Sequence, residues 1–379
     1  MKIGITCYPT YGGSGAVATE LGIALADRGH EVHFITYRQP FRLPSFLPRI
    51  FFHEVDVGRY PLFEFPPYDL ALAVRMHEVV RTHGLELLHC HYAIPHATSA
   101  WIAREMLRET GEDIHLITTL HGTDITIVGQ DPSFYPITKF SIEKSDRITA
   151  VSEYLRAETC RAFGCEGLEI DVIHNFIDPD IYNREKYPPL LKKQFGASKS
   201  ILMHVSNFRA VKRVRDVVRI FAEVNRELPS VLVMIGDGPD RPAAEEEARM
   251  LGVEESVSFL GKLDMIAPLL AAADLFLLPS QSESFGLSAL EALASGVPVV
   301  GSDAGGLPEV IRDGETGILC AVGDIPGMSA ASLGILQDKK RWAEMSQLAT
   351  EDARERFSRD AIVTKYESLY QRSLPIPTS

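Results

Sequence analysis

The sequence predicts an α/β protein with two doubly wound domains, each built on a parallel sheet. Three observations support this fold class. The chain has 379 residues, enough for two domains of roughly 100–200 residues each. Short apolar segments alternate with amphipathic helical segments from the N-terminus onwards. The alternation stops near residues 175–196, which are rich in Pro, Asp and Lys, and then restarts.

The first domain is predicted to open with a strand over residues 2–8, a glycine-rich turn, and a helix over 16–28 that Gly29 ends. A second strand follows at 31–36. This β-turn-α-β opening is typical of a doubly wound sheet. Further strands are expected at 85–89, 115–120 and 147–151, with a helix at 97–107.

The second domain repeats the pattern after the break. Strands are predicted at 201–205, 231–235, 257–260, 275–278 and 297–300, with a helix at 214–227 and mostly helical sequence beyond Gly327. We expect an N-terminal Rossmann-like domain at 1–183, a C-terminal Rossmann-like domain at 184–355, and a last helix at 356–379 that packs back towards the first domain. Ligands of open α/β sheets bind outside the carboxyl ends of the strands, so functional residues are expected in the loops there.

Charge and composition exclude several classes of protein. Against 38 Lys and Arg stand 51 Asp and Glu, and the net charge of −13 argues against binding to nucleic acid or an anionic membrane. No apolar run approaches the length of a membrane span, so we expect no integral membrane association and a cytoplasmic protein. The five cysteines are an odd number and are expected to be reduced: Cys7, Cys90, Cys160, Cys165 and Cys320.

The glycine-rich turn after the first strand can bring backbone amides close to an anion. Gly13-x-Gly15-x-x-Ala18 also fits a loose dinucleotide-binding fingerprint. That fingerprint requires an acidic residue at the end of the second strand, where Thr36 is followed by Tyr37 and then Arg38. The turn alone therefore indicates an anion site only weakly.

The loop at 281–291 precedes a helix and carries Glu283 and Glu291. Amides near Phe285 and Gly286 could hold a phosphate, and carboxylates accept hydrogen bonds from sugar hydroxyls, so the combination suits a sugar nucleotide. The alternative is a solvated helix start whose acids complement the helix dipole. Both interpretations are open at this point.

The loop at 206–213 concentrates Arg209, Lys212 and Arg213 in an otherwise acidic chain. Guanidinium and ammonium groups of this kind suit a diphosphate. The alternative is an ordinary basic helix start, although cations there oppose the helix dipole.

Two loops of the first domain carry histidines. His121 lies beside a glycine at a strand end, where a structural role is the usual alternative to a substrate contact. His89 and His91 point the same way along a strand, with His96 nearby. Zinc is an alternative there, but a closed site needs four ligands and the sequence suggests no matching cluster elsewhere. A structural or substrate-facing role for Tyr92 and its neighbours is favoured.

Taken together, these motifs resemble the retaining GT-B glycosyltransferases of family four, which have two Rossmann-like domains facing a central cleft. The motifs are GGSG, HGTD, the basic loop, GDGP at 236–239 and E-x7-E from Glu283 to Glu291. Longer strings such as TTLHGTDIT, SDRITAVS, HNFID and HVSNFR resemble the branch of that family that acts in bacillithiol biosynthesis. The resemblance covers nearly the whole chain, from Lys2 to about Tyr370.

The resemblance implies a set of site residues. It implies catalytic roles for His121, Arg209, Lys212 and Glu283; donor binding by Gly13, Arg209, Lys212, Gly236, Glu283, Ser284, Phe285, Gly286, Leu287 and Glu291; and acceptor binding by Ser14, Tyr92, Thr123 and Arg147. Many relatives have Arg at the position of Asn207, so Arg209 is expected to substitute for it from two positions later.

The implied reaction moves N-acetylglucosamine from UDP-N-acetylglucosamine to the 2-hydroxyl of L-malate with retention, without a metal or other cofactor. An inositol phosphate or a glycan as acceptor remains an alternative. A dinucleotide-dependent oxidoreductase leaves E-x7-E unexplained, and a sugar-nucleotide sensor would share the donor site. The expected partners are the two small substrates, with no nucleic acid and with a homo-oligomer as an open possibility.

Overall fold

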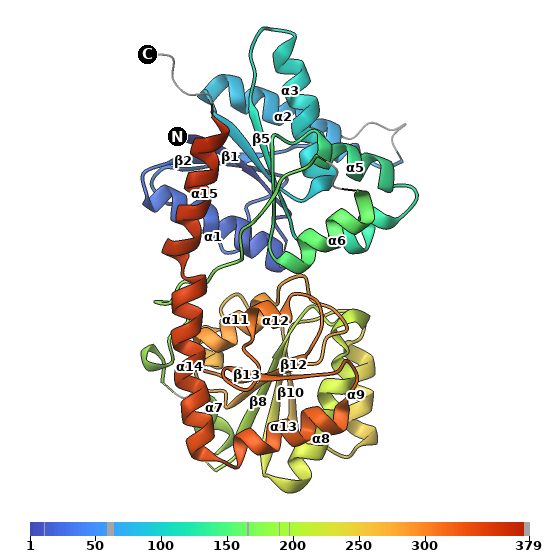
Figure 1. Ribbon diagram of the computed structural model, residues 1–379, viewed down its shortest axis with the longest axis vertical. Helices are drawn as coiled ribbons and strands as arrows, with labels where there is room; N and C mark the ends of the chain where they lie inside the picture. The colour runs from blue at the N-terminus through green and yellow to red at the C-terminus, as the bar shows by residue number, and fades with distance from the viewer. Residues whose placement is uncertain (11, 59–63, 165–166, 189, 197, 375–379) are drawn as a thin grey trace. The chain divides into compact units, whose positions relative to one another are not determined.

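The computed structural model describes residues 1–374 except 11, 59–63, 165–166, 189 and 197. The chain divides into two compact units. The first contains residues 1–174 and 360–379, and the second contains residues 175–359. Each unit is an α/β layered structure, as the sequence predicts (Figure 1).

The described residues of the first unit form a seven-stranded sheet in the order β3-β2-β1-β4-β5-β6-β7, with every neighbouring pair parallel. The strands are β1 (Lys2–Thr6), β2 (Glu31–Thr36), β3 (Ile50–Glu54), β4 (Leu87–His91), β5 (His115–Leu120), β6 (Arg147–Ala150) and β7 (Ile170–Val172). The central strands are buried at nearly every residue, on both sides of the chain, because helices cover both faces of the sheet.

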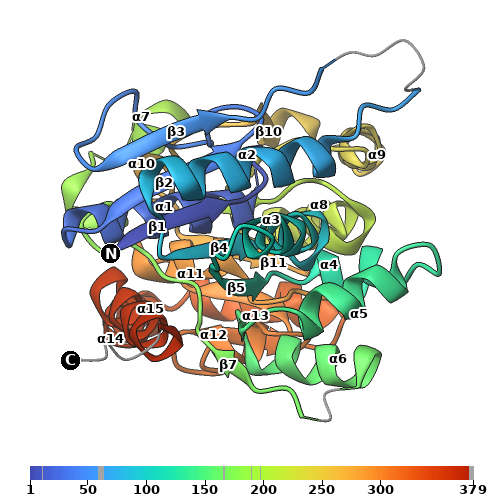
Figure 2. The ribbon, with the colours of Figure 1, turned by 90° about the horizontal axis from the view of Figure 1, so that it is seen from above.

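Helices cover both faces of this sheet. They are α1 (Gly13–Asp27), α2 (Tyr68–His83), α3 (Thr98–Arg108), α4 (Thr123–Thr126), α5 (Tyr135–Glu143), α6 (Glu153–Phe163) and α15 (Arg359–Ser373). Helices α2 and α3 pack side by side on one face over Leu88 and Cys90 (Figure 2). The opposite face carries α1 and α15, and Arg28 at the end of α1 pairs with Glu367 of α15 at 2.6 Å.

The boundary between the units lies earlier than the expected 183/184, and the second boundary lies at 359/360 rather than 355/356. Two interactions tie residues 175–183 to the second unit. The Ile177 amide donates to the Phe357 carbonyl at 3.0 Å, and the Tyr182 hydroxyl donates to Glu291. The last helix, α15, packs on the first sheet, where Tyr370 bonds to His89.

The described residues of the second unit form a six-stranded parallel sheet in the order β10-β9-β8-β11-β12-β13. Its strands are β8 (Ser200–Val205), β9 (Ser230–Ile235), β10 (Val257–Gly261), β11 (Leu275–Leu278), β12 (Val299–Ser302) and β13 (Gly317–Cys320). Its helices are α7 (Leu190–Phe195), α8 (Val214–Glu227), α9 (Arg241–Met250), α10 (Ala267–Leu270), α11 (Leu287–Ala294), α12 (Leu307–Val310), α13 (Ile325–Leu336) and α14 (Lys339–Phe357).

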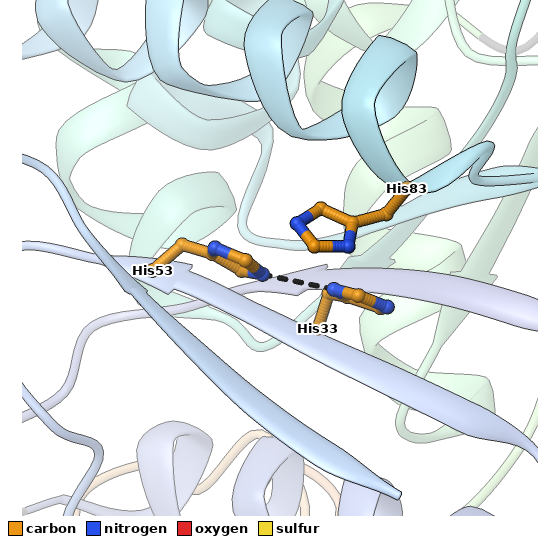
Figure 3. A group of neighbouring side chains, drawn as sticks. All are labelled: His33, His53 and His83. Atoms are coloured by element: carbon orange, nitrogen blue, oxygen red, sulfur yellow. Dashed lines mark hydrogen bonds between the residues drawn. The ribbon is translucent and has the colours of Figure 1, made fainter.

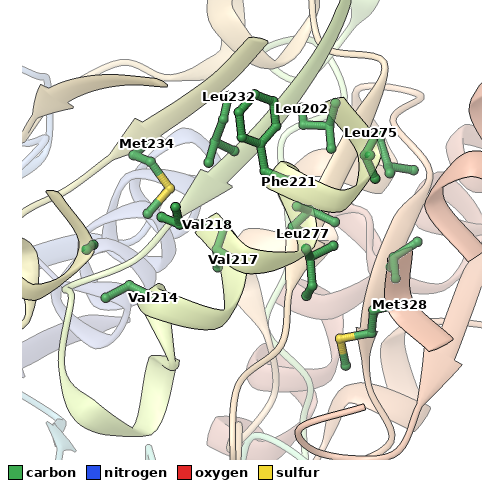
Figure 4. Packing of buried hydrophobic residues seen from close by; sticks show 14 of the residues in the cluster. Leu202, Val214, Val217, Val218, Phe221, Leu232, Met234, Leu275, Leu277 and Met328 are labelled. Atoms are coloured by element: carbon green, nitrogen blue, oxygen red, sulfur yellow. The ribbon is translucent and has the colours of Figure 1, made fainter. Parts of the chain in front are cut away.

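The core of the second unit forms between α8 and the sheet (Figure 4). Val217 and Phe221 from α8 pack against Leu232 of β9 and Leu277 of β11, and all four side chains are fully buried. Val214, Val217, Val218 and Phe221 recur at helical spacing, which gives α8 one continuous apolar face. The remaining face of α8 carries Arg215, Arg219 and Arg226.

Several predicted elements match the structure residue for residue, including 31–36, 115–120, 214–227 and 275–278. The strand predicted at 85–89 is β4, two residues later, because the Leu85 amide still donates to Val80 and closes α2. The expectation of five reduced cysteines is wrong: Cys160 is disulfide-bonded. A disulfide depends on the separation and direction of two side chains, which a count of cysteines does not reveal.

Among the helices that the structure describes, none combines the length and the apolar character needed to cross a membrane.

Candidate active site

In the sheet of the second unit, strand order reverses between β8 and β11. At such a switch point the two following loops diverge and leave a crevice at the carboxyl edge of the sheet. The loop after β8 carries Arg209 and Lys212, and the loop after β11 carries Glu283. The topology therefore places both predicted donor motifs at the same edge of one sheet.

Lys212 and Glu283 are in direct contact. The Lys212 ammonium donates to Oε1 of Glu283 at 2.7 Å, and the Ser280 hydroxyl donates to the same oxygen at 2.8 Å. The two charged side chains are only 18% and 10% exposed, so water screens the pair weakly. A cation and a carboxylate with unused bonding capacity thus lie together, which suits a ligand with both phosphates and hydroxyls.

Glu291 lies in α11, at the other end of the E-x7-E spacing, and is buried with 5% exposure. Its Oε1 accepts a hydrogen bond of 2.5 Å from the Tyr182 hydroxyl. Helix α11 starts after Gly286, whose φ is +99°, and a Cβ there would lie 2.5 Å from Leu307 Cδ2. Only glycine fits this position without strain, and the first-turn amides of α11, beginning at Leu287, have no acceptor within the helix.

Close backbone packing shapes the neighbouring loops. Gly236 has φ +118°, and a Cβ there would lie 1.7 Å from the Ser206 carbonyl oxygen. Gly305, with φ +64°, lies close to Glu283, because a Cβ there would lie 2.1 Å from the Glu283 carbonyl oxygen. The Gly306 amide also donates to that oxygen at 2.7 Å. The backbone next to the Glu283 carboxylate is therefore held by two glycines.

Sequence reasoning missed Gly305, Gly306, Ser280 and Tyr182 as supports of this site. The glycine pair that follows a strand end at Ser302 was a usable signal, because paired glycines indicate close backbone approach. Tyr182 carries no such signal, since only the fold brings it to Glu291.

The other basic residues of the loop differ in their surroundings. Arg213 pairs with Asp216 in the first turn of α8, so its charge is already neutralised. Arg209 is exposed and has no ion pair with any residue that the structure describes. Asn207 is likewise exposed. Within the described part of this loop, Arg209 is therefore a cation without an ion pair. Ser284 and Phe285 lie in the segment between Glu283 and α11.

In the first unit, strand order reverses between β1 and β4. The glycine turn after β1 and the loop after β4 flank this switch point. A Cβ at Gly15 would lie 2.5 Å from the Tyr8 carbonyl oxygen, so the turn needs glycine there. Gly13 is exposed and Ser14 partly exposed, in the first turn of α1, which contains no acidic residue. The N-terminus of α1 is therefore electrostatically suited to an anion.

A cluster of aromatic rings follows β4 and β5. His121 stacks on His91 and on Tyr92, and its Nε2 lies 2.8 Å from Nδ1 of His91. Tyr8 packs edge-on against Tyr92 and His96, with ring centroids 5.2 and 4.7 Å away. Tyr92 has φ +104°, a strained conformation for a non-glycine residue that is typical of functional sites.

The imidazoles of this cluster are neutral at pH 7. Loss of hydration on burial lowers the pKa of His121 to about 3 and that of His96 to about 4. His96 Nδ1 donates to the His91 carbonyl at 2.8 Å, while its Nε2 is buried without a partner among the described residues. Neutral rings next to an unsatisfied nitrogen suit hydrogen bonding to a polar ligand.

Asp124 holds the HGTD loop in place. Its buried carboxylate accepts from the Gly122 amide at 2.9 Å, from the His121 amide at 3.2 Å and from the Ala93 amide at 3.1 Å. Burial raises its pKa to about 6, against these three hydrogen bonds. Thr123 starts α4 beside this carboxylate. Asp124 thereby fixes the positions of His121 and Thr123 relative to the loop that carries Tyr92.

His89 belongs to a structural network rather than to a metal site. Its Nδ1 bonds to the Tyr370 hydroxyl at 2.8 Å and its Nε2 to the Thr119 hydroxyl at 2.7 Å. Both ring nitrogens are therefore used in anchoring α15 to β4 and β5. Among the described residues, the group of three histidines that could hold a metal lies elsewhere, at His33, His53 and His83.

Arg147 does not join the cluster around His121. It is the first residue of β6 and pairs in register with Ile117, whereas His121 follows the last residue of β5. Four residue steps separate the level of Ile117 from that of His121, or about 13 Å along an extended chain. Its guanidinium pairs with Glu169 at 2.8 Å. The expected acceptor role of Arg147 has no support from this geometry, because the parallel direction of β5 and β6 puts Arg147 at the amino edge of the sheet.

Both units contain a segment that matches a family of known proteins. Residues 11–181 match the family described as "Glycosyltransferase Family 4", and residues 199–338 match "Glycosyl transferases group 1". The N-acetyl-alpha-D-glucosaminyl L-malate synthase of Bacillus anthracis is 49% identical over 98% of this chain and 96% of its own length. A D-inositol 3-phosphate glycosyltransferase 2 of Catenulispora acidiphila is 27% identical over 96% of this chain and 90% of its own length.

Solved structures agree on the fold. The sucrose-phosphate synthase of Thermosynechococcus elongatus superposes with a TM-score of 0.78 at 21% identity, covering 98% of both chains. Anabaena HepE in complex with UDP and glucose superposes with a TM-score of 0.78 at 20% identity, covering 98% of this chain and 99% of its own. The chain belongs to the GT-B glycosyltransferase family that includes the N-acetyl-alpha-D-glucosaminyl L-malate synthase of Bacillus anthracis.

Proposed function

We propose that the protein is a retaining glycosyltransferase that moves N-acetylglucosamine from UDP-N-acetylglucosamine to the 2-hydroxyl of L-malate. The donor half rests on one observation above all, the contact between Lys212 and Glu283 beside α11. The choice of sugar and acceptor follows the relative that is 49% identical over 98% of the chain.

Lys212 stabilises the negative charge that develops on the departing diphosphate, and Arg209 assists from the exposed side of the loop. Glu283 accepts hydrogen bonds from the sugar hydroxyls, and the amides near Phe285 and Gly286 bind phosphate oxygens. Glu291 binds the ribose hydroxyls with Tyr182 orienting its carboxylate. Each role matches the chemistry of its side chain.

The bond to the leaving diphosphate breaks and the bond to the acceptor forms on the same face of the sugar. The anomeric carbon breaks its bond to the diphosphate oxygen and forms a bond to the malate hydroxyl oxygen, through an oxocarbenium-like transition state. The hydroxyl proton passes to the leaving diphosphate. This route needs no nucleophilic carboxylate and no metal, because the cations and the helix N-terminus supply the stabilisation.

His121 serves as a neutral hydrogen-bonding group beside the sugar, because its lowered pKa keeps it uncharged. Tyr92, Thr123 and Ser14 hold the acceptor, and the first-turn amides of α1 bind a malate carboxylate. Gly13 has no side chain, which leaves room for the malate carboxylate to approach these amides. The cytoplasmic location and any homo-oligomer remain predictions.

The test is UDP release from UDP-N-acetylglucosamine in the presence of EDTA, with L-malate, with D-inositol 3-phosphate, and with no acceptor. We expect release only with malate, a product of the mass of N-acetylglucosaminyl malate, and an α-anomer by NMR coupling. Release only with the inositol phosphate would keep the transferase and overturn the acceptor. Loss of activity in EDTA that Mg²⁺ or Mn²⁺ restores would overturn the metal-free mechanism.

A further inference from the structure

Three histidines from separate elements of the first unit meet on the α2 face of its sheet. His33 comes from β2, His53 from the neighbouring edge strand β3, and His83 from the last residue of α2 (Figure 3). Each offers a ring nitrogen, and these ligand atoms all lie within 4.8 Å of one another. We call His33, His53 and His83 the histidine trio.

The trio is tightly packed. Nδ1 of His33 lies 2.8 Å from Nε2 of His53, and the two rings are stacked with a centroid distance of 5.1 Å. The His83 ring lies 4.7 Å from His33 and 4.9 Å from His53. His33 is fully buried, while His53 and His83 are partly exposed, so water and ions can reach the group from the His53 and His83 side.

A carboxylate sets the orientation of His33. Its Nε2 lies 3.0 Å from Oε1 of Glu31, which in turn pairs with Lys2. An ionised carboxylate accepts, so Nε2 carries the proton and Nδ1 presents its lone pair towards His53. Metal-binding histidines commonly donate their other ring nitrogen to a carboxylate in this way.

We propose that the histidine trio is a binding site for a divalent transition-metal ion of the zinc class, with solvent as the fourth ligand. Neutral imidazole suits Zn²⁺ and its neighbours Co²⁺, Ni²⁺ and Cu²⁺, whereas Mg²⁺ and Ca²⁺ prefer oxygen ligands.

Modest side-chain movement completes the site. Zn–N bonds of about 2.0–2.1 Å in a tetrahedron put the nitrogens about 3.3 Å apart. The 2.8 Å contact between His33 and His53 therefore opens by about 0.5 Å, and the third nitrogen closes in. His53 and His83 are the partly exposed members, so their rings are less confined than the fully buried ring of His33.

The position indicates a structural or regulatory ion rather than a catalytic one. His83 ends α2 just before β4 begins, which places the trio away from the strand-end loops that carry His121 and Tyr92. A bound ion would tie the edge strand β3 to β2 and to the end of α2. Ligands that bind only the folded state stabilise it by mass action.

The experiment uses the full-length chain without a polyhistidine tag, stripped with EDTA and then dialysed. Binding of Zn²⁺ is measured by competition with a chromophoric chelator, and Co²⁺ binding by visible absorption. The variants are His53→Gln and His83→Gln, with His77→Gln on the same helix α2 as the matched control. Circular dichroism checks that each variant is folded.

We expect one equivalent of Zn²⁺ to bind to the wild type and to H77Q, and to raise their melting temperatures. H53Q and H83Q should bind at least tenfold more weakly and show no added stabilisation. The proposal is overturned if the stripped wild type binds no stoichiometric metal, or if H53Q and H83Q bind as tightly as H77Q. Transferase activity in EDTA tests the proposed function separately.

Discussion

Lys212→Met tests whether the cation beside Glu283 stabilises the leaving group. The substitution keeps the length of the side chain and removes its charge. If a unit negative charge develops about 4 Å from the ammonium, the interaction is worth about 4 kcal/mol at an effective dielectric of about 20. Lys212 is 18% exposed, so solvent screens part of this interaction. We expect kcat to fall about 100- to 1000-fold, or about 2.7–4 kcal/mol.

The effect should be specific to the transition state. The charge on the diphosphate increases as the bond to the sugar breaks, so UDP affinity should fall much less than kcat. Turnover is measured by UDP release at saturating donor and acceptor, and UDP affinity by calorimetry. Lys199→Met is the matched control, because Lys199 is exposed and precedes β8 while Lys212 follows it.

Two results would refute this reasoning. One is a kcat within threefold of wild type, which would mean that Lys212 is not near the developing charge. The other is an equal loss in kcat and in UDP affinity, which would make Lys212 a ground-state binding residue. If the substitution lowers the melting temperature so far that the variant unfolds under the assay conditions, the assay is repeated at a lower temperature, where the variant is folded. The loss of kcat is then measured on folded protein.

Three further predictions follow from the geometry. Gly236→Ala should destabilise the fold by more than about 2 kcal/mol, because the new Cβ would meet the Ser206 carbonyl at 1.7 Å, whereas Gly58→Ala has open space and should be neutral in thermal melts. Burial lowers the pKa of His204 from 6.5 to about 4, so the unfolded chain takes up a proton below pH 6.5 that the folded chain does not. The contribution of neutral His204 to the free energy of unfolding is therefore complete above pH 6.5 and is smaller by about 2 kcal/mol at pH 5. In urea melts, the free energy of unfolding of His204→Gln should change less with pH than that of the wild type. An equal change with pH in both proteins would contradict this. Arg147→Ala should leave the KM for malate within twofold, and a tenfold rise in steady-state assays would restore its predicted acceptor role.

Much of the donor half could be predicted from the sequence. Helical spacing of Val214, Val217 and Phe221 defines α8, and the apolar run at 275–278 defines β11. Because the carboxyl ends of parallel strands lie at the same edge of a sheet, the loops that carry Lys212 and Glu283 are then expected at that edge. Their contact at 2.7 Å required the strand order β8-β11, which no local pattern contains.

The acceptor half was predicted less completely. The HGTD motif correctly marks the loop after β5, but the chain direction of β6 puts Arg147 at the opposite edge of the sheet. A motif gives the identity of a residue, whereas the position of that residue at the start or the end of a strand decides which edge of the sheet its side chain is near. The starts of short strands depend on where the preceding helix ends, as Leu85 illustrates.

Local sequence therefore specified the elements, the turns that need glycine and the residue types of the donor loops, because these depend on spacing and backbone sterics over a few positions. The tertiary structure decided which distant groups meet. Tyr182 reaches Glu291, Tyr370 reaches His89, and the histidine trio assembles from three elements, although the sequence suggested no second histidine cluster. Such contacts arise from strand order and helix packing across many residues, and these are properties of the folded chain as a whole.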